Sequence, residues 1–136
     1  MTETANGETL YRFAHPDAFP PGQVEIPASI FNDVNMSCDW QRVRPDPATS
    51  AQVSQAGRTV VVSISICDAI RNPTNPKRIG QVVPDWQQRI FHDPVAENPG
   101  DPYAPNEAHA LIQGRKKGAV VDAIRANSTM AQVQVA

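Results

Sequence analysis

The chain has 136 residues, a formal net charge of −2 and an apolar fraction of 40%. This length accommodates one hydrophobic core, and the small negative charge argues against an extended nucleic-acid surface or an anionic-lipid surface, because both need excess Lys and Arg. No stretch approaches the roughly 20 apolar residues that span a bilayer, and the first residues lack the features of a secretion signal. We therefore expect one cytoplasmic domain without membrane contact.

Proline and cysteine usage set two further expectations. The chain contains 13 prolines, and each proline fixes φ and removes a backbone donor. This density predicts short elements joined by long proline-rich loops. The two cysteines, Cys38 and Cys67, lack the paired spacing of a zinc site or a redox motif, so we expect both to be reduced.

The first elements are a leader and two strands. Residues 1–7 are polar and are expected to form a disordered leader before a domain of residues 8–136, whose first strand begins near Glu8. In residues 34–40 the apolar side chains alternate with Ser37 and Asp39, which is the pattern of a half-buried strand. Ser37 and Asp39 are therefore expected on the face opposite the core.

The middle of the chain predicts a helix, a strand and a helical turn. Asp46 and Pro47 have the chemistry of a helix start, and Gly57 is a natural stop. Residues 60–66 are apolar and β-branched, which predicts a central strand. Residues 67–72 predict a single helical turn that ends at the following prolines.

The second half predicts three more strands and one helix. Strands are expected over 86–92 and 107–113, separated by an irregular proline loop over 93–106. An apolar stripe predicts a helix over 119–126, and 130–135 is expected to form a final edge strand. The fold class is therefore α+β: a single small domain with a mixed or antiparallel sheet, two or three short helices and long Pro-rich loops.

Three short stretches of the chain resemble a known group of sequences. They are Leu10-Tyr11-Arg12, Met36-Ser37-Cys38-Asp39 and the closing stretch from Asn106 to Arg115. They resemble a group of short bacterial proteins with Leu-Tyr-Arg, Met-Ser-X-Asp and Asn-Pro-Ala-His-Ala motifs, although Glu107 replaces the proline of the last motif and Arg115 replaces its lysine. The resemblance implies a compact bacterial domain and brings no particular activity.

One functional hypothesis is catalytic and uses Arg12, Ser37, Asp39 and His109. Arginine binds phosphate or carboxylate, histidine moves a proton near neutral pH, and aspartate fixes the histidine tautomer. This set suits a hydrolase or group transferase that acts on a phosphate-bearing substrate. Ser37 lacks the Gly-X-Ser-X-Gly elbow that presents a nucleophile. The structural alternative is an Arg12–Asp39 ion pair with His109 at a strand edge.

Two weaker hypotheses involve other residues. The chain is also similar to ADP-ribosyl transfer enzymes in its arginine-bearing first strand and serine-bearing second strand, with Glu107 as the only candidate for their terminal glutamate. His92, Asp93 and His109 are candidate metal ligands, but they lack the spacing that presets such ligands, and we expect no metal or other cofactor. The third histidine of the chain, His15, occurs in the sequence His15-Pro16-Asp17.

The preferred hypothesis is a protein-interaction or ligand-binding module. The proline loop would present Tyr103 as a rigid aromatic contact to a protein partner. The basic turn formed by Arg115, Lys116 and Lys117 would hold an anionic small molecule at a helix entrance, where Gly114 and Gly118 allow close approach. This class requires no convergence of side chains from separate strands.

Overall fold

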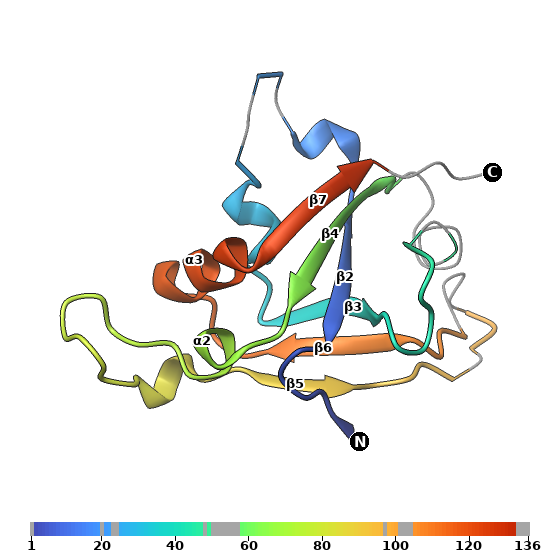
Figure 1. Cartoon of the computed structure of the whole chain (residues 1–136). Coiled ribbons are helices and arrows are strands. Elements are labelled where there is room, and N and C mark those ends of the chain that lie inside the picture. The colour runs from blue at the N-terminus through green and yellow to red at the C-terminus, as the bar shows by residue number, and fades with distance from the viewer. Residues whose placement is uncertain are drawn as a thin grey trace.

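The structure is a computed structural model that describes residues 2–19, 21–22, 25–47, 49, 58–96, 98–100 and 105–132. Its described part is a small single domain built on a seven-stranded sheet with the order β1-β5-β6-β3-β2-β4-β7, in which every pairing is antiparallel (Figure 1). The strands are β1 (Thr2–Glu3), β2 (Thr9–Ala14), β3 (Asn35–Trp40), β4 (Val60–Ser65), β5 (Arg89–His92), β6 (His109–Gln113) and β7 (Ser128–Gln132).

Helices are short in the described part of the chain. They are the α-helices α2 (Asp68–Arg71) and α3 (Gly118–Ala126) and the 3₁₀ helices η1 (Pro16–Ala18), η2 (Ala28–Phe31) and η3 (Pro84–Trp86). None of the described helices is long and apolar enough to cross a membrane. The helix expected between Asp46 and Gly57 lies mostly outside the described residues.

Most of the predicted elements are present. The strands expected at 34–40, 60–66 and 107–113 and the helices expected at 67–72 and 119–126 are confirmed, with shifts of a few residues at their ends. The strand expected over 86–92 is shorter, because Trp86 belongs to η3 and pairing begins at Arg89. The final strand begins at Ser128 and pairs with β4 through its whole length, at one edge of the sheet.

The N-terminal segment differs from the expected disordered leader. Thr2 and Glu3 pair with His92 and Phe91 on β5, and the Thr4 N–H donates to the Ile90 carbonyl at 2.9 Å. Thr4 is fully buried. The polar composition suggested disorder, but the edge of β5 offers backbone partners that a polar segment satisfies as well as an apolar one.

The sheet divides at a corner between β2 and β3. These strands pair only at Leu10↔Trp40 and Tyr11↔Asp39, after which β2 continues alongside β4 and β3 continues alongside β6. In Figure 1, β2, β4 and β7 accordingly run in a different direction from β5 and β6. The domain therefore consists of two strand groups that are joined along a short seam.

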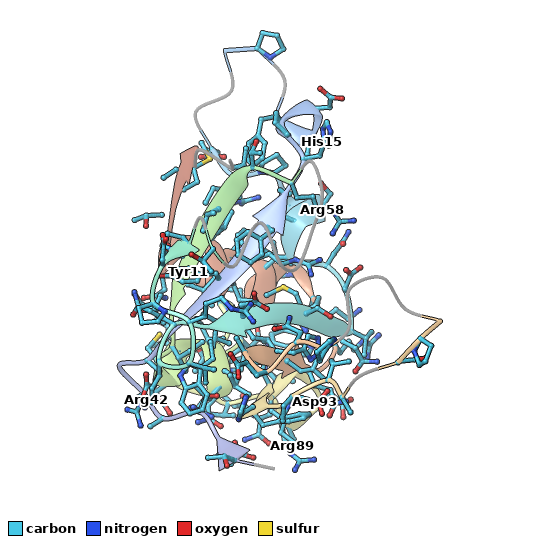
Figure 2. All side chains as sticks on the ribbon, turned by 90° about the vertical axis from the view of Figure 1, so that its right-hand side faces the viewer. Tyr11, His15, Arg42, Arg58, Arg89 and Asp93 are labelled. Carbon is cyan, nitrogen blue, oxygen red and sulfur yellow. The ribbon has the colours of Figure 1, made fainter. Side chains whose placement is uncertain are left out.

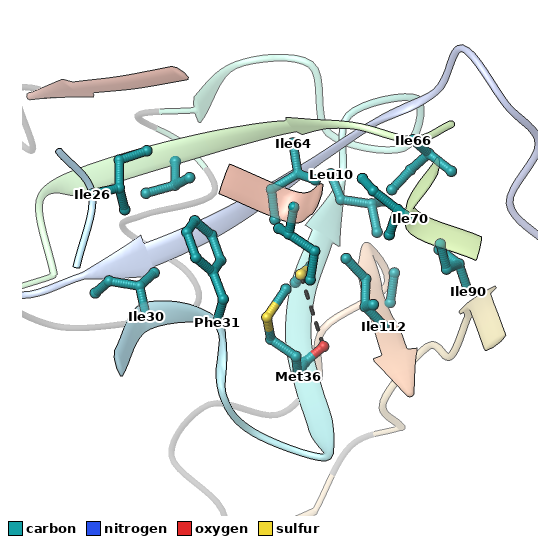
Figure 3. Close-up of a cluster of buried hydrophobic side chains, with 14 of the residues drawn as sticks. Leu10, Ile26, Ile30, Phe31, Met36, Ile64, Ile66, Ile70, Ile90 and Ile112 are labelled. Atoms are coloured by element: carbon teal, nitrogen blue, oxygen red, sulfur yellow. Dashed lines mark hydrogen bonds between the residues drawn. The ribbon is translucent and has the colours of Figure 1, made fainter. Parts of the chain in front are cut away.

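The main core lies on one face of this bent sheet. It contains alternate residues of the central strands, such as Leu10 and Ile64, together with Phe31 from η2 (Figure 3). Val120 from α3 belongs to the same core. The opposite face carries a smaller cluster of Tyr11, Phe13 and Val61. We refer to these as the core face and the outer face. The period-two alternation of each strand assigns its side chains to one face or the other.

The turn between β6 and α3 passes close to the segment that follows η3. The Gln88 side chain donates from Nε2 to the carbonyls of Trp86 and Arg115, at 2.8 and 2.9 Å. Gly114 lies against the Gln88 side chain, which joins the two segments, and its φ is 153°. A Cβ at Gly114 would lie 2.7 Å from Gln88 Nε2 and 2.8 Å from the Gln87 carbonyl oxygen. Only glycine fits this position, for both steric and conformational reasons.

We predict that Gly114→Ala destabilises the domain by about 3 kcal/mol, because it combines an unfavourable positive φ with a contact that neighbouring backbone must relieve. Urea unfolding monitored by tryptophan fluorescence measures this change. Gly118→Ala is the matched control, because no heavy atom lies within 4 Å of a Cβ there and its φ is not positive. Equal stabilities of the two variants would contradict this account of Gly114.

Candidate functional site

Three of the predicted site residues, Ser37, Asp39 and His109, share the outer face of the sheet. The register pairs Tyr11 with Asp39 and Asp39 with His109, so these side chains form a row across β2, β3 and β6. Asp93 extends the row beyond β5, since its N–H donates to the His109 carbonyl at 2.8 Å. The strand pairing alone brings Asp39 and His109 together, as the catalytic hypothesis requires.

Asp39 is held by neighbouring donors within this row. Its side chain is only 3% exposed, Oδ2 accepts from Arg44 Nη1 at 3.1 Å, and Oδ1 accepts from Asn106 Nδ2 at 2.9 Å. Asn106 Oδ1 in turn accepts from the Ala108 N–H at 3.1 Å. This network fixes the segments that follow β3 and precede β6. A buried carboxylate with a charged donor and an amide donor is a structural anchor, since both oxygens are already engaged.

His109 has a different partner from Asp39. Its Nδ1 lies 2.8 Å from the Asp93 carbonyl oxygen and 3.5 Å from Asp93 Oδ2, and the side chain is 17% exposed. Nδ1 thus donates to a backbone oxygen in the neutral tautomer that this contact selects. Asp93, rather than the predicted Asp39, orients His109.

Arg12 lies on the core face and does not join this row. Its guanidinium donates from Nε to the Ile30 carbonyl at 3.2 Å, from Nη1 to the Ser37 carbonyl at 2.8 Å and from Nη2 to Asp33 Oδ2 at 2.8 Å. The predicted convergence of Arg12 with Asp39 and His109 is therefore wrong, because alternation along β2 sends Tyr11 and Arg12 to opposite faces. The alternative Arg12–Asp39 ion pair is also wrong: the two partners are Asp33 and Arg44.

Ser37 lies on the outer face with Asp39, and its register partner on β6 is Leu111. Its side chain is exposed. No hydrogen bond connects the Ser37 hydroxyl to His109 in the described part of the chain, so the arrangement lacks an activated nucleophile there. Glu107, which the comparison with ADP-ribosyl transfer enzymes singled out, is exposed, and its carbonyl oxygen lies 2.7 Å from His92 Nε2.

The three histidines do not form a common site. His92 is on the core face, where its ring centroid lies 5.1 Å from that of Trp40, whereas His109 is on the outer face. His15 precedes η1, where its Nδ1 accepts from the Asp17 N–H at 3.2 Å. Figure 2 shows His15 and Asp93 at opposite ends of the domain. No group of three or more metal-ligating side chains occurs among the described residues.

The basic turn places its central lysine inward. Lys116 Nζ donates to the carbonyls of Ile112 and Gly114, each at 2.9 Å, and contacts that of Val34 at 3.3 Å. Burial lowers the pKa of Lys116 to about 8. The ammonium thus closes the turn internally, and the absence of a Cβ at Gly114 makes room for the Gln87 carbonyl oxygen and the Gln88 side chain. Arg115 and Lys117 are exposed.

Two features complete the comparison with the predicted sites. Tyr103 lies outside the described residues. Residues 73–83, for which the sequence predicted no functional role, form a projecting hairpin with an isoleucine at its tip. The available signal was an isolated apolar residue between Lys77-Arg78 and Gly80, in a segment with prolines on both sides.

Comparison of the chain with protein-family models, with curated proteins and with solved structures finds no match. The chemistry and geometry of the chain itself therefore carry the functional proposal. In the described residues, internal contacts hold the outer-face row together, whereas Ile79 is fully exposed.

We predict that Asp39→Ala destabilises the domain by about 3–5 kcal/mol, because it leaves the Arg44 guanidinium, which is 11% exposed, without its carboxylate. Thermal and urea unfolding measure this loss. Asp122→Ala is the control, since Asp122 is 74% exposed and its pair with Arg125 lies on the helix surface. A stability of Asp39→Ala within about 0.5 kcal/mol of wild type would contradict the structural role of Asp39.

We predict that iodoacetamide at pH 8 modifies Cys67 and leaves Cys38 intact in the folded protein. Burial raises the pKa of the Cys38 thiol to about 12, so the reactive thiolate is absent at pH 8, whereas Cys67 is partly exposed. Peptide mass spectrometry with and without urea distinguishes the sites. Both cysteines should react in urea, and equal modification of both without urea would refute the burial of Cys38.

Proposed function

We propose that this chain is a protein-interaction module and that the hairpin of residues 73–83, here called the Ile79 finger, contacts the partner. The observation that carries the proposal is the complete exposure of Ile79: its relative exposure is 100%. Val82 on the same finger is 40% exposed. A cytoplasmic location is part of the proposal and is supported by the two unpaired cysteines.

The finger is an ordered element. An isolated bridge pairs Thr74 with Val82, and the Asn75 N–H donates to the Gln81 carbonyl at 3.0 Å. The Arg78 N–H donates to the Asn75 carbonyl, and the Gln81 N–H donates to the Arg78 carbonyl, each at 3.0 Å. In Figure 1 the finger is the yellow-green loop that extends away from the sheet beyond α2.

Two consecutive turns place Ile79 at the tip. The second turn runs from Arg78 to Gln81, and Gly80 occupies its third position with φ of 80°, as a type II turn requires. Ile79 is the second residue of this turn and points away from the domain. Because the backbone is already fixed by these bonds, docking of Ile79 into a partner costs little additional ordering.

The charge beside the tip defines the chemistry of the partner. Lys77 and Arg78 are exposed and form no ion pair in the part of the chain that the structure describes. An apolar pocket rimmed by carboxylates on another protein would complement both the isoleucine and these two cations. The proposed partner is therefore a protein with an acidic rim around an apolar pocket.

A membrane surface fits this finger less well. Full burial of one isoleucine contributes about 2 kcal/mol, and each cation near an anionic surface adds about 1 kcal/mol. The sum corresponds to millimolar binding. A protein pocket adds close packing around the same side chain, so it makes better use of a single fixed anchor.

We predict that a photoreactive amino acid at position 79 cross-links to one protein in the native host, and that Lys77→Glu with Arg78→Glu removes this product. The same photoreactive group at Val34, which is also an exposed apolar position at 58%, is the matched control. With the identified partner, Ile79→Asp should weaken binding at least about thirtyfold, from loss of the buried isoleucine.

Several results would refute the finger as the binding element. Cross-linking patterns at positions 79 and 34 that are identical would show no specific contact. Binding to the partner that is unchanged by Ile79→Asp would remove its anchor role. Cross-linking to lipid alone would assign the finger to a membrane surface instead.

A further inference from the structure

Within the described residues, the outer edge of β7 lacks the usual protections of an edge strand. Exposed edges are normally blocked by charged residues, prolines, bulges or a covering segment, because their free N–H and C=O groups recruit further strands. The sequence from Ala126 to Ala136 contains no charged residue and no proline. β7 is flanked on one side by β4, and no described strand pairs with its other side.

The backbone register identifies which groups point outward. The Ser65 N–H donates to the Asn127 carbonyl at 2.9 Å, and Ile64 pairs with Ser128. Because hydrogen-bonded pairs alternate along an antiparallel ladder, Thr129 and Ala131 direct their backbone groups toward β4. Ser128, Met130 and Gln132 therefore direct their N–H and C=O groups away from β4, toward the outer edge.

An apolar groove adjoins the same edge. It has a volume of about 290 Å³ and is lined by Pro16, Phe19, Val60, Met130 and Ala131. The Met130 side chain is on the core face, since Met130 pairs with Val62, and 39% of the residue is exposed. The edge thus combines backbone groups that can pair with an apolar surface that can be covered.

We infer that β7 pairs antiparallel with β7 of a second copy of this chain, in a two-fold dimer centred on Met130. Each outward residue contributes one N–H and one C=O. When the two-fold axis passes through Met130, Met130 pairs with Met130 of the second copy, and Ser128 pairs with Gln132 of the second copy. Every outward N–H and C=O group of β7 then has a complementary group. This inference is independent of the Ile79 finger and goes beyond the proposed function.

Three features favour a second copy over another occupant. The strand is uncharged, so two copies face each other without repulsion. The outward groups lie symmetrically about Met130, as self-pairing requires. A two-fold axis perpendicular to the sheet keeps both core faces on the same side, which places Met130 of the second copy beside the groove. The result is one continuous antiparallel sheet across both copies.

Sedimentation of the purified chain over a broad concentration range tests the dimer. We expect twice the monomer mass of 14.8 kDa at high concentration. Met130→Pro should raise the dimer dissociation constant about a hundredfold, because it removes two symmetric hydrogen bonds yet leaves the β4 ladder intact. Met130→Lys should disrupt the dimer through charge, whereas Val34→Lys, the control at another exposed apolar position, should not.

Disulfide cross-linking in a Cys67→Ser background tests the register. Two Met130→Cys residues would have Cα atoms about 5.5 Å apart, which suits a disulfide, whereas two Ser128→Cys residues would have Cα atoms about 14 Å apart. We expect a linked dimer for Met130→Cys alone. A monomer at all concentrations, a dimer insensitive to both Met130 variants, or linkage through Ser128→Cys would overturn the inference. A monomer that binds only an added foreign strand would also overturn it.

Discussion

The hydrogen bonds of Arg12 hold together the corner on which the rest of the fold depends. Just after β3, the Gln41 N–H donates to the Thr9 carbonyl of β2 at 3.1 Å. Because hydrogen-bonded pairs alternate along an antiparallel ladder, the Ser37 carbonyl also points toward β2. Where β2 turns away to continue with β4, this carbonyl loses its strand partner. Arg12 Nη1 replaces that partner at 2.8 Å, while its other nitrogens bind the Ile30 carbonyl and Asp33.

The charged residues that stabilise the fold are different from the residues on the surfaces that remain available for binding. Arg12 fastens the seam on the core face, Asp39 fastens the outer face through Arg44 and Asn106, and Lys116 closes the turn before α3. Each of these groups is engaged with internal partners and thereby contributes to the stability of the fold. Two surfaces of the described chain remain for binding: the Ile79 finger, with its exposed isoleucine, and the β7 edge beside the apolar groove.

The sequence predicted the strands much better than the site. Alternation in residues 34–40 and the β-branched run at 60–66 directly encode burial, and the apolar stripe at 119–126 encodes a helix face. The site depends on where β2 leaves β3, which no local pattern specifies, so Arg12 and Asp39 could not be assigned to opposite faces. The contacts of Lys116 with three carbonyl oxygens also depend on the tertiary structure. In the sequence, three consecutive basic residues indicate an exposed turn, so these contacts could not be predicted.

The central claim is that Arg12 fastens the corner and is not a substrate ligand, and the stability of Arg12→Met tests it most directly. We expect urea unfolding to show a loss of about 3 kcal/mol, because two backbone carbonyls lose their donors. Arg89→Met, at a 53% exposed side chain, should change stability by less than about 1 kcal/mol. A functional arginine is typically neutral or unfavourable for stability, so an unchanged or more stable Arg12→Met variant would contradict the account.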